Sequence, residues 1–270
     1  MIHLSSIALR EPRPSVERVT AFPFDVPAIH TLPELRLDTP VTMFVGENGS
    51  GKSTLLEAVA IAAHLPTAGA AEATDDATLA GPRALADNLR LGWTARTHRG
   101  LFLRAEDFFG FARRTAEMRA GLAADLERVD AEYADRPGLA RDLARTPYLD
   151  EISALDRRYG EGLDTQSHGE AFLRFFEARL VPRGLYVLDE PEAPLSPARQ
   201  LAFLAMLRRL VEADCQAIIA THSPIVLAFP GAAIWDFDQT PIARTAWANL
   251  EHVQLVRDFL ASPEAFLRHL

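Results

Sequence analysis

The residues of this chain best suited to phosphate chemistry form the pattern Gly-x-x-x-x-Gly-Lys-Ser. They are Gly46, Glu47, Asn48, Gly49, Ser50, Gly51, Lys52 and Ser53, with Thr54 directly after them. Glycines let backbone N–H groups fold around an anion, and a helix that begins here adds the positive end of its dipole. The lysine ammonium would then reach the β- and γ-phosphates of a nucleotide, and the serine hydroxyl would bind Mg²⁺.

The identity of the lysine supports this interpretation. Lysine and arginine together number 28, and Lys52 is the only lysine among them. An ammonium is a compact point charge on a flexible stem, whereas a guanidinium is a wide planar fork. A closed phosphate loop has room for the first, so the pattern favours a phosphate site over an ordinary glycine-rich turn.

The segments beside the loop are those that such a loop needs. Apolar residues 41–45 run directly into Gly46 and suit a buried parallel strand. After the loop, apolar residues recur at helical spacing, at Leu55, Leu56, Val59 and Ala63. We therefore expect a strand, the glycine loop and then a helix that begins near Lys52.

Two further apolar segments also end in polar residues. Residues 185–188 lead into Asp189 and Glu190, and residues 217–220 lead to His222. The carboxyl ends of parallel strands meet at one edge of a sheet, so these side chains should lie beside the glycine loop. The alternatives are a surface carboxylate for Asp189 and a helix-capping residue for His222.

Each of these side chains suits a separate task at a triphosphate. Asp189 offers the hard oxygen that Mg²⁺ prefers, opposite Ser53. Glu190 could orient or deprotonate the attacking water, and His222 could hydrogen-bond the γ-phosphate. Glu106, which follows the expected strand 100–104, could also reach the metal or could be a simple surface charge.

Two aromatic residues precede the phosphate loop. Phe22 and Phe24 lie in a proline-rich stretch shortly before the strand at residues 41–45. Either ring could stack on an adenine, and either could instead pack in the core.

Bulk composition limits the surroundings of the protein. The net charge is −9 and the pI about 5.4 over 270 residues, so electrostatics disfavours nucleic acid and anionic membranes, although a dimer could build a basic cleft from arginines. Cys215 is the only cysteine, so no disulfide can form within the chain, and a reducing, cytoplasmic location is expected. We find no segment long enough to cross a membrane, and no leader at the N-terminus.

A charged helical block interrupts the alternation of strands and helices. From residue 112 to residue 133 the apolar residues step by three and four, and further helical pieces follow, with a break expected at Thr146-Pro147. The sequence thus predicts an α/β core formed by residues 1–106 and 171–270, with an inserted helical subdomain at residues 107–170. The first strand, at residues 2–9, suggests an N-terminal antiparallel β part.

The order of these motifs resembles the ABC-type ATPase superfamily of P-loop NTPases. The stretch 46–54 is similar to its Walker A motif, residues 185–190 to its Walker B motif with the catalytic glutamate, and His222 to its switch histidine. Glu106 stands where the family has a glutamine. The stretch 166–170 occupies the place of the family signature, and it keeps only the serine and the second glycine, Ser167 and Gly169.

The resemblance implies a fold, a reaction and partners. It implies a RecA-like core with a mainly parallel sheet, Mg²⁺-dependent hydrolysis of ATP, and a homodimer that closes around two ATP molecules, with Ser167 and Gly169 acting on the other subunit's nucleotide. Closure would do conformational work on an unidentified protein partner. The altered signature, the glutamate at position 106 and the compact length together resemble soluble bacterial ABC-like ATPases related to the SMC and RecF groups. The alternatives are the ATP-binding subunit of a transporter and a low-turnover ATP sensor in DNA repair or phage defence.

Overall fold

The computed structural model describes residues 1–10, 21–67, 80–159 and 168–268. Its centre is a six-stranded sheet in the order β5-β6-β7-β3-β8-β9. The first five strands in that order pair in parallel, and β9 pairs with β8 in the antiparallel sense. The strands are β3 (Val41–Val45), β5 (Gly100–Arg104), β6 (Leu185–Asp189), β7 (Gln216–Ala220), β8 (Ala233–Asp236) and β9 (Ala243–Thr245).

The sheet is covered on both faces, which explains why its central strands are continuously apolar. Side chains alternate between the two faces of a strand, so in β3 Phe44 enters one hydrophobic core while Met43 and Val45 enter the other. The first core also holds α2 (Pro27–His30), α3 (Lys52–Ala62) and α4 (Ala80–Asn88). The second holds α7 (His168–Glu177), α8 (Pro197–Glu212) and α9 (Pro224–Leu227).

A second, three-stranded antiparallel sheet has the order β2-β1-β4. Its strands are β1 (Leu4–Leu9), β2 (Leu35–Arg36) and β4 (Leu89–Trp93). Gln216 of β7 joins it to the main sheet, because its side-chain oxygen accepts hydrogen bonds from the N–H groups of His3 and Leu4 at 2.8 Å each. The predicted fold class, a mainly parallel α/β sheet with an N-terminal antiparallel part, is therefore confirmed.

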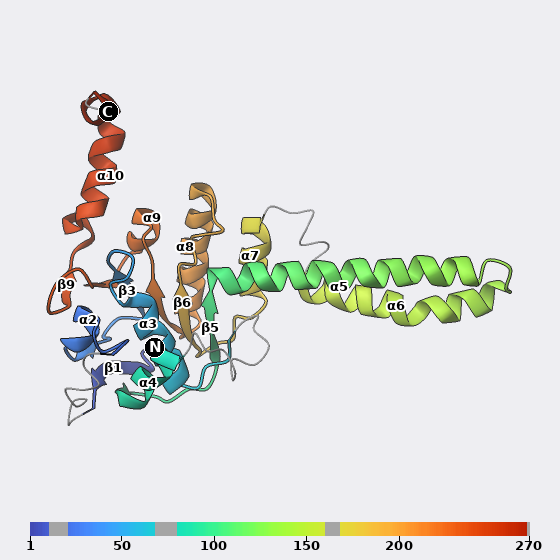
Figure 1. Cartoon of the computed structure of the whole chain (residues 1–270), viewed down its shortest axis with the longest axis horizontal. Helices are drawn as coiled ribbons and strands as arrows, with labels where there is room; N and C mark the ends of the chain where they lie inside the picture. The colour runs from blue at the N-terminus through green and yellow to red at the C-terminus, as the bar shows by residue number, and fades with distance from the viewer. Residues whose placement is uncertain (11–20, 68–79, 160–167, 269–270) are drawn as a thin grey trace.

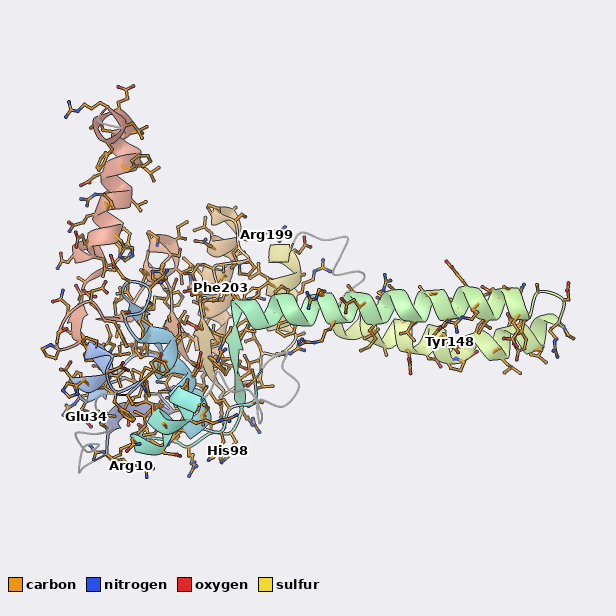
Figure 2. All side chains as sticks on the ribbon, viewed as in Figure 1. Arg10, Glu34, His98, Tyr148, Arg199 and Phe203 are labelled. Atoms are coloured by element: carbon orange, nitrogen blue, oxygen red, sulfur yellow. The ribbon has the colours of Figure 1, made fainter. Side chains whose placement is uncertain are left out.

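Two long helices form a hairpin that projects from one edge of the main sheet (Figure 1). They are α5 (Ala105–Glu132) and α6 (Gly138–Tyr159), and Figure 2 shows Tyr148 of α6 well away from the sheet. The break expected at Thr146-Pro147 is wrong, because α6 runs through Pro147. Packing along α5 keeps the helix continuous although proline removes one hydrogen bond. The division at residues 106/107 and 170/171 remains a prediction.

The chain leaves the sheet through a short 3₁₀ turn (Trp247–Asn249) and two helices, α10 (Glu251–Ala261) and α11 (Pro263–Leu267). In Figure 1 α10 stands beyond the edge of the sheet at which the phosphate loop lies. Among the described helices, none has the length and apolar character that crossing a membrane requires.

Candidate nucleotide-binding site

The glycine loop connects β3 to α3 as the pattern predicts. Gly51 has φ 99°, in the left-handed region that favours glycine, and α3 begins at the next residue. A Cβ on Gly51 would also come within 3.1 Å of Val26 Cγ1, because α2 packs directly under the loop. The backbone conformation therefore favours glycine strongly here, and the close approach of Val26 leaves little room for a side chain.

Lys52 is folded back onto its own loop. Its Nζ donates hydrogen bonds to Gly46 O at 2.7 Å, to Glu47 O at 2.8 Å and to Ser50 Oγ at 3.3 Å, and the residue is only 4% exposed. Burial lowers the pKa of Lys52, against the opposing effect of nearby carboxylates led by Asp238. The ammonium thus occupies the centre of the loop, where a phosphate group would take over as its partner.

Ser53 and Asp189 meet although 136 residues separate them. The Ser53 hydroxyl donates to Asp189 Oδ1 at 3.1 Å, which joins the first turn of α3 to the end of β6. Burial raises the pKa of Asp189 to about 6, although the hydrogen bond from Ser53 acts in the opposite direction. The Ser53 hydrogen bond offsets only part of the cost of burying the Asp189 charge, so a cation would stabilise this carboxylate. A carboxylate beside a hydroxyl is also a pair of hard-oxygen ligands of the kind that Mg²⁺ accepts.

Glu190 and His222 face each other at the ends of β6 and β7. The distance from His222 Nε2 to Glu190 Oε1 is 3.7 Å, and the buried Nε2 makes no hydrogen bond among the described residues. Glu190 has φ 48°, so the chain turns sharply after Asp189 and aims the two adjacent carboxylates differently. Burial lowers the pKa of His222, and the Lys52 ammonium lowers it further. The sheet thus brings Lys52, Ser53, Asp189, Glu190 and His222 to one edge.

Glu192 is part of this site, and the sequence reasoning missed it. Its Oε1 accepts a hydrogen bond from the backbone N–H of His222 at 2.8 Å, while its Oε2 is buried and accepts none within the described ranges. Burial raises the pKa of Glu192, against the lowering effect of the Thr221 hydroxyl. The signal was present in the sequence, because Glu192 follows the predicted catalytic Glu190 by two residues in Glu-Pro-Glu.

Replacing Glu192 with glutamine should stabilise the protein more at pH 8 than at pH 5. The pKa of this carboxyl is raised in the folded state above its ordinary value of 4.5. The contribution of the protonated carboxyl to the free energy of unfolding is therefore fully present below pH 4.5, and it is lost as the pH rises through the folded-state pKa. Glutamine does not titrate, and its side-chain oxygen can still accept from His222 N. Thermal unfolding should show a gain of a few °C at pH 8, since about 1 kcal/mol moves the midpoint by roughly 2–4 °C in a chain of this size.

The control is Glu212→Gln, on the exposed face of α8, which should leave both midpoints unchanged. An equal shift of the Glu192→Gln midpoint at pH 5 and at pH 8 would contradict the assignment of a proton to this buried carboxyl.

A second acidic residue that the sequence reasoning missed, Asp238, contacts the phosphate loop. Its Oδ1 accepts a hydrogen bond from the Glu47 N–H at 2.8 Å. It also lines a cavity of about 390 Å³ beside the loop, which extends to His222 and to His252 of α10. Nothing in the local pattern after β8 marks Asp238, because its contact depends on the pairing of β8 with β3.

The two phenylalanines differ in their surroundings. Phe24 is 5% exposed and packs in the first core, so it takes the core alternative and presents no face for stacking. Phe22 is 57% exposed, and its ring lies against Gly81 of α4, where a Cβ would come within 2.2 Å of it. Stacking on adenine remains a prediction for Phe22 alone.

The remaining predicted residues lie on the helical side. Glu106 is in the first turn of α5, but its side chain is outside the described part, as is the whole of Ser167. Gly169 is buried at the start of α7, and a Cβ there would lie 2.9 Å from Pro194 O. Gly169 therefore allows α7 to approach the loop after β6 in its own chain, and its role toward a second copy stays a prediction. A Cβ on Gly169 would also lie 2.6 Å from Cδ of Arg199, which is in the first turn of α8 (Figure 2).

Comparison with known families agrees with this arrangement. A family model described as an AAA domain matches residues 28–70, and one described as "AAA domain, putative AbiEii toxin, Type IV TA system" matches residues 171–228. The first match contains the phosphate loop, and the second contains Asp189, Glu190 and His222. The chain resembles ABC-type P-loop ATPases. No curated protein matches it.

Several solved structures are similar to this chain. An SMC head domain with an extended coiled coil, bound to the C-terminal domain of ScpA, from Pyrococcus furiosus has TM-score 0.47 and 11% identity, and covers 96% of this chain and 100% of its own. A nucleotide-free ATP-binding cassette from an ABC transporter has TM-score 0.44 and 17% identity, with 88% and 90% covered. The SMC head domain from Thermotoga maritima has TM-score 0.42 and 15% identity, with 90% and 98% covered.

Proposed function

We propose that this protein binds Mg²⁺-ATP and hydrolyses it to ADP and phosphate. The observation that carries the proposal is the hydrogen bond from Ser53 to Asp189, 3.1 Å long, in the immediate surroundings of Lys52, Glu190 and His222. This contact supports a site in which a phosphate loop, a pair of hard-oxygen ligands for the metal and a candidate base share the carboxyl edge of one sheet.

Each side chain has a distinct task in this proposal. Lys52 leaves the loop carbonyls and binds the β- and γ-phosphates. Glu190 accepts a proton from the water that attacks the γ-phosphorus as the bond to the bridging oxygen of ADP breaks. His222 Nε2, which has no hydrogen-bond partner among the residues that the structure describes, contacts a γ-phosphate oxygen. Bound Mg²⁺, held by Ser53 and Asp189, would neutralise charge on the β- and γ-phosphate oxygens.

We further propose that two copies close around two nucleotides and act on a protein partner. The support is the position of α7, whose first turn lies against the loop that follows β6. Its backbone N–H groups are therefore near the nucleotide edge, where a second copy could use them. The proposed location is the cytoplasm, because the only cysteine, Cys215, is a buried free thiol.

Asp189→Asn tests the proposed reaction. Asparagine keeps an oxygen that can accept from Ser53, so the fold should survive, but it removes the negative charge that holds Mg²⁺. Phosphate release at saturating ATP should fall at least about a hundredfold. Isothermal titration in EDTA should show unchanged binding of ATP. If the wild type releases no phosphate and also binds no ATP, the proposed function is wrong.

One observation favours a second candidate, an ATP sensor with little turnover. Glu170 occupies the position of the family's signature glutamine, and its carboxylate pairs with Arg174 at 3.0 Å and Arg199 at 3.5 Å in its own chain. A side chain held in this way is less available to another subunit's nucleotide. Steady-state phosphate release, measured with and without DNA, separates the two candidates, since a sensor binds ATP under every condition and turns over under none.

A further inference from the structure

A second cavity lies beside Ser53 and Asp189, the two proposed Mg²⁺ ligands, and its described lining includes one basic residue. Its volume is about 320 Å³, and it is lined by Ser53, Glu57, Arg104, Ala105, Asp189, Glu190 and Ala193. Among these described lining residues, Arg104 alone is cationic. The cavity therefore places a guanidinium next to the two proposed metal ligands and the proposed base.

The contacts of Arg104 leave part of its hydrogen-bonding capacity unused. Its Nη2 is 2.7 Å from Glu57 Oε1, and the two side chains are only 17% and 13% exposed. Its guanidinium lies 5.5 Å from the ring centre of Phe102, and its Nε is buried and donates no hydrogen bond within the described ranges. A guanidinium has five N–H donors, so a second anion can bind while the first ion pair loosens.

The charge of Arg104 already acts on the site. It lowers the pKa of Asp189, against the larger effect of burial. Glu57 is on the second turn of α3, the helix whose first turn carries Lys52 and Ser53. The ion pair with Glu57 thus connects the phosphate-loop helix to the end of β5 and holds the Arg104 guanidinium at the wall of the cavity.

We propose that Arg104 exchanges its ion pair with Glu57 for the terminal phosphate of ATP bound in the same chain. This inference rests on the proposed function, and it assigns a phosphate-contacting residue that no sequence motif marked. Glu57 serves as the resting counterion, so that the guanidinium is buried with a partner when no triphosphate is present. The exchange makes the site distinguish ATP from ADP, because only ATP offers the terminal phosphate.

The test compares affinities for ADP and for a non-hydrolysable ATP analogue, measured by isothermal titration with Mg²⁺. For Arg104→Gln, the affinity for the analogue should fall roughly tenfold or more, because a hydrogen bond to a charged group is lost, while the affinity for ADP stays within about twofold. For Glu57→Gln, the preference for the analogue over ADP should be kept or increased, because the competing carboxylate is gone.

Arg209→Gln is the matched control. Arg209 forms an ion pair with Glu177 at the same 2.7 Å distance, but both side chains are exposed, so its loss should change neither affinity. Thermal unfolding of every variant shows whether the fold is kept.

The outcomes separate this inference from the proposed function. Wild-type protein that binds neither nucleotide overturns the proposed function. Wild type that binds both, with an unchanged preference in Arg104→Gln, overturns the assignment of Arg104. A similar loss of preference in Arg104→Gln and Glu57→Gln would show that the ion pair only supports the fold, and it also overturns the assignment. Should Arg104→Gln fail to fold, Arg104→Lys takes its place and should also lose preference, because an ammonium cannot reproduce the guanidinium fork.

Discussion

Lys52→Ala protein should lose affinity for ATP by roughly 10²- to 10³-fold, with a fall in phosphate release at least as large. In the structure the ammonium donates to two carbonyl oxygens and one hydroxyl of its own loop. In the ATP-bound state these donors would face the β- and γ-phosphates, whose negative charge no other lysine in the chain could offset. Binding of a fluorescent ATP analogue and a phosphate-release assay measure the two effects.

Lys52→Arg gives a sharper version of the same test. It keeps the charge, but Lys52 is 4% exposed inside a closed loop, so the wider guanidinium has no room there. We expect Lys52→Arg to be nearly as inactive as Lys52→Ala, and an exposed substitution such as Arg208→Ala to be neutral. Undiminished ATP binding and turnover in Lys52→Ala would overturn the proposed nucleotide site.

Glu190→Gln should separate binding from hydrolysis. Glutamine has the same shape and can adopt the same turn, but it cannot accept the proton of the attacking water. Phosphate release should fall roughly 10²- to 10⁴-fold, while affinity for ATP changes by only a few fold. Because bound ATP then persists, light scattering after size exclusion should show a particle of twice the monomer mass in Mg²⁺-ATP and a monomer without nucleotide.

The two parts of this expectation can fail separately. Unchanged phosphate release in Glu190→Gln would remove Glu190 as the base, whatever the mass of the particle. A monomer at saturating Mg²⁺-ATP would remove the shared, two-copy site while leaving hydrolysis in place. Glu212→Gln, an exposed change on α8, is the control for both measurements.

Much of the site could be predicted because its signals are local. The glycine loop, the apolar strand before it and the helix after it are contiguous, and the structure places β3 and α3 at those residues. Strands β6 and β7 were predictable for the same reason, since a short apolar run that ends in polar residues indicates a buried strand and the point where it stops. Because the carboxyl ends of parallel strands lie at one edge of a sheet, the sequence also predicted that Asp189, Glu190 and His222 lie close together.

Local signals failed where burial depended on distant segments. Phe22 and Phe24 are two residues apart with similar neighbours, yet one is exposed and the other is in the core. Pro147 was expected to end a helix, but packing against α5 outweighs the lost hydrogen bond. In both cases tertiary contacts stabilise the observed arrangement, and local sequence propensity carries no information about those contacts.

By itself the sequence determined the phosphate loop, the strands that end in polar residues, and the α/β class, because each depends on residues adjacent along the chain. Only the tertiary structure decided that Glu192 fixes the backbone of His222, that Asp238 supports the loop, and that Arg104 pairs with Glu57 beside Asp189. These contacts join segments that are up to 191 residues apart. They exist only because the pairing of β5, β6, β7, β3 and β8 sets the register in which those side chains meet.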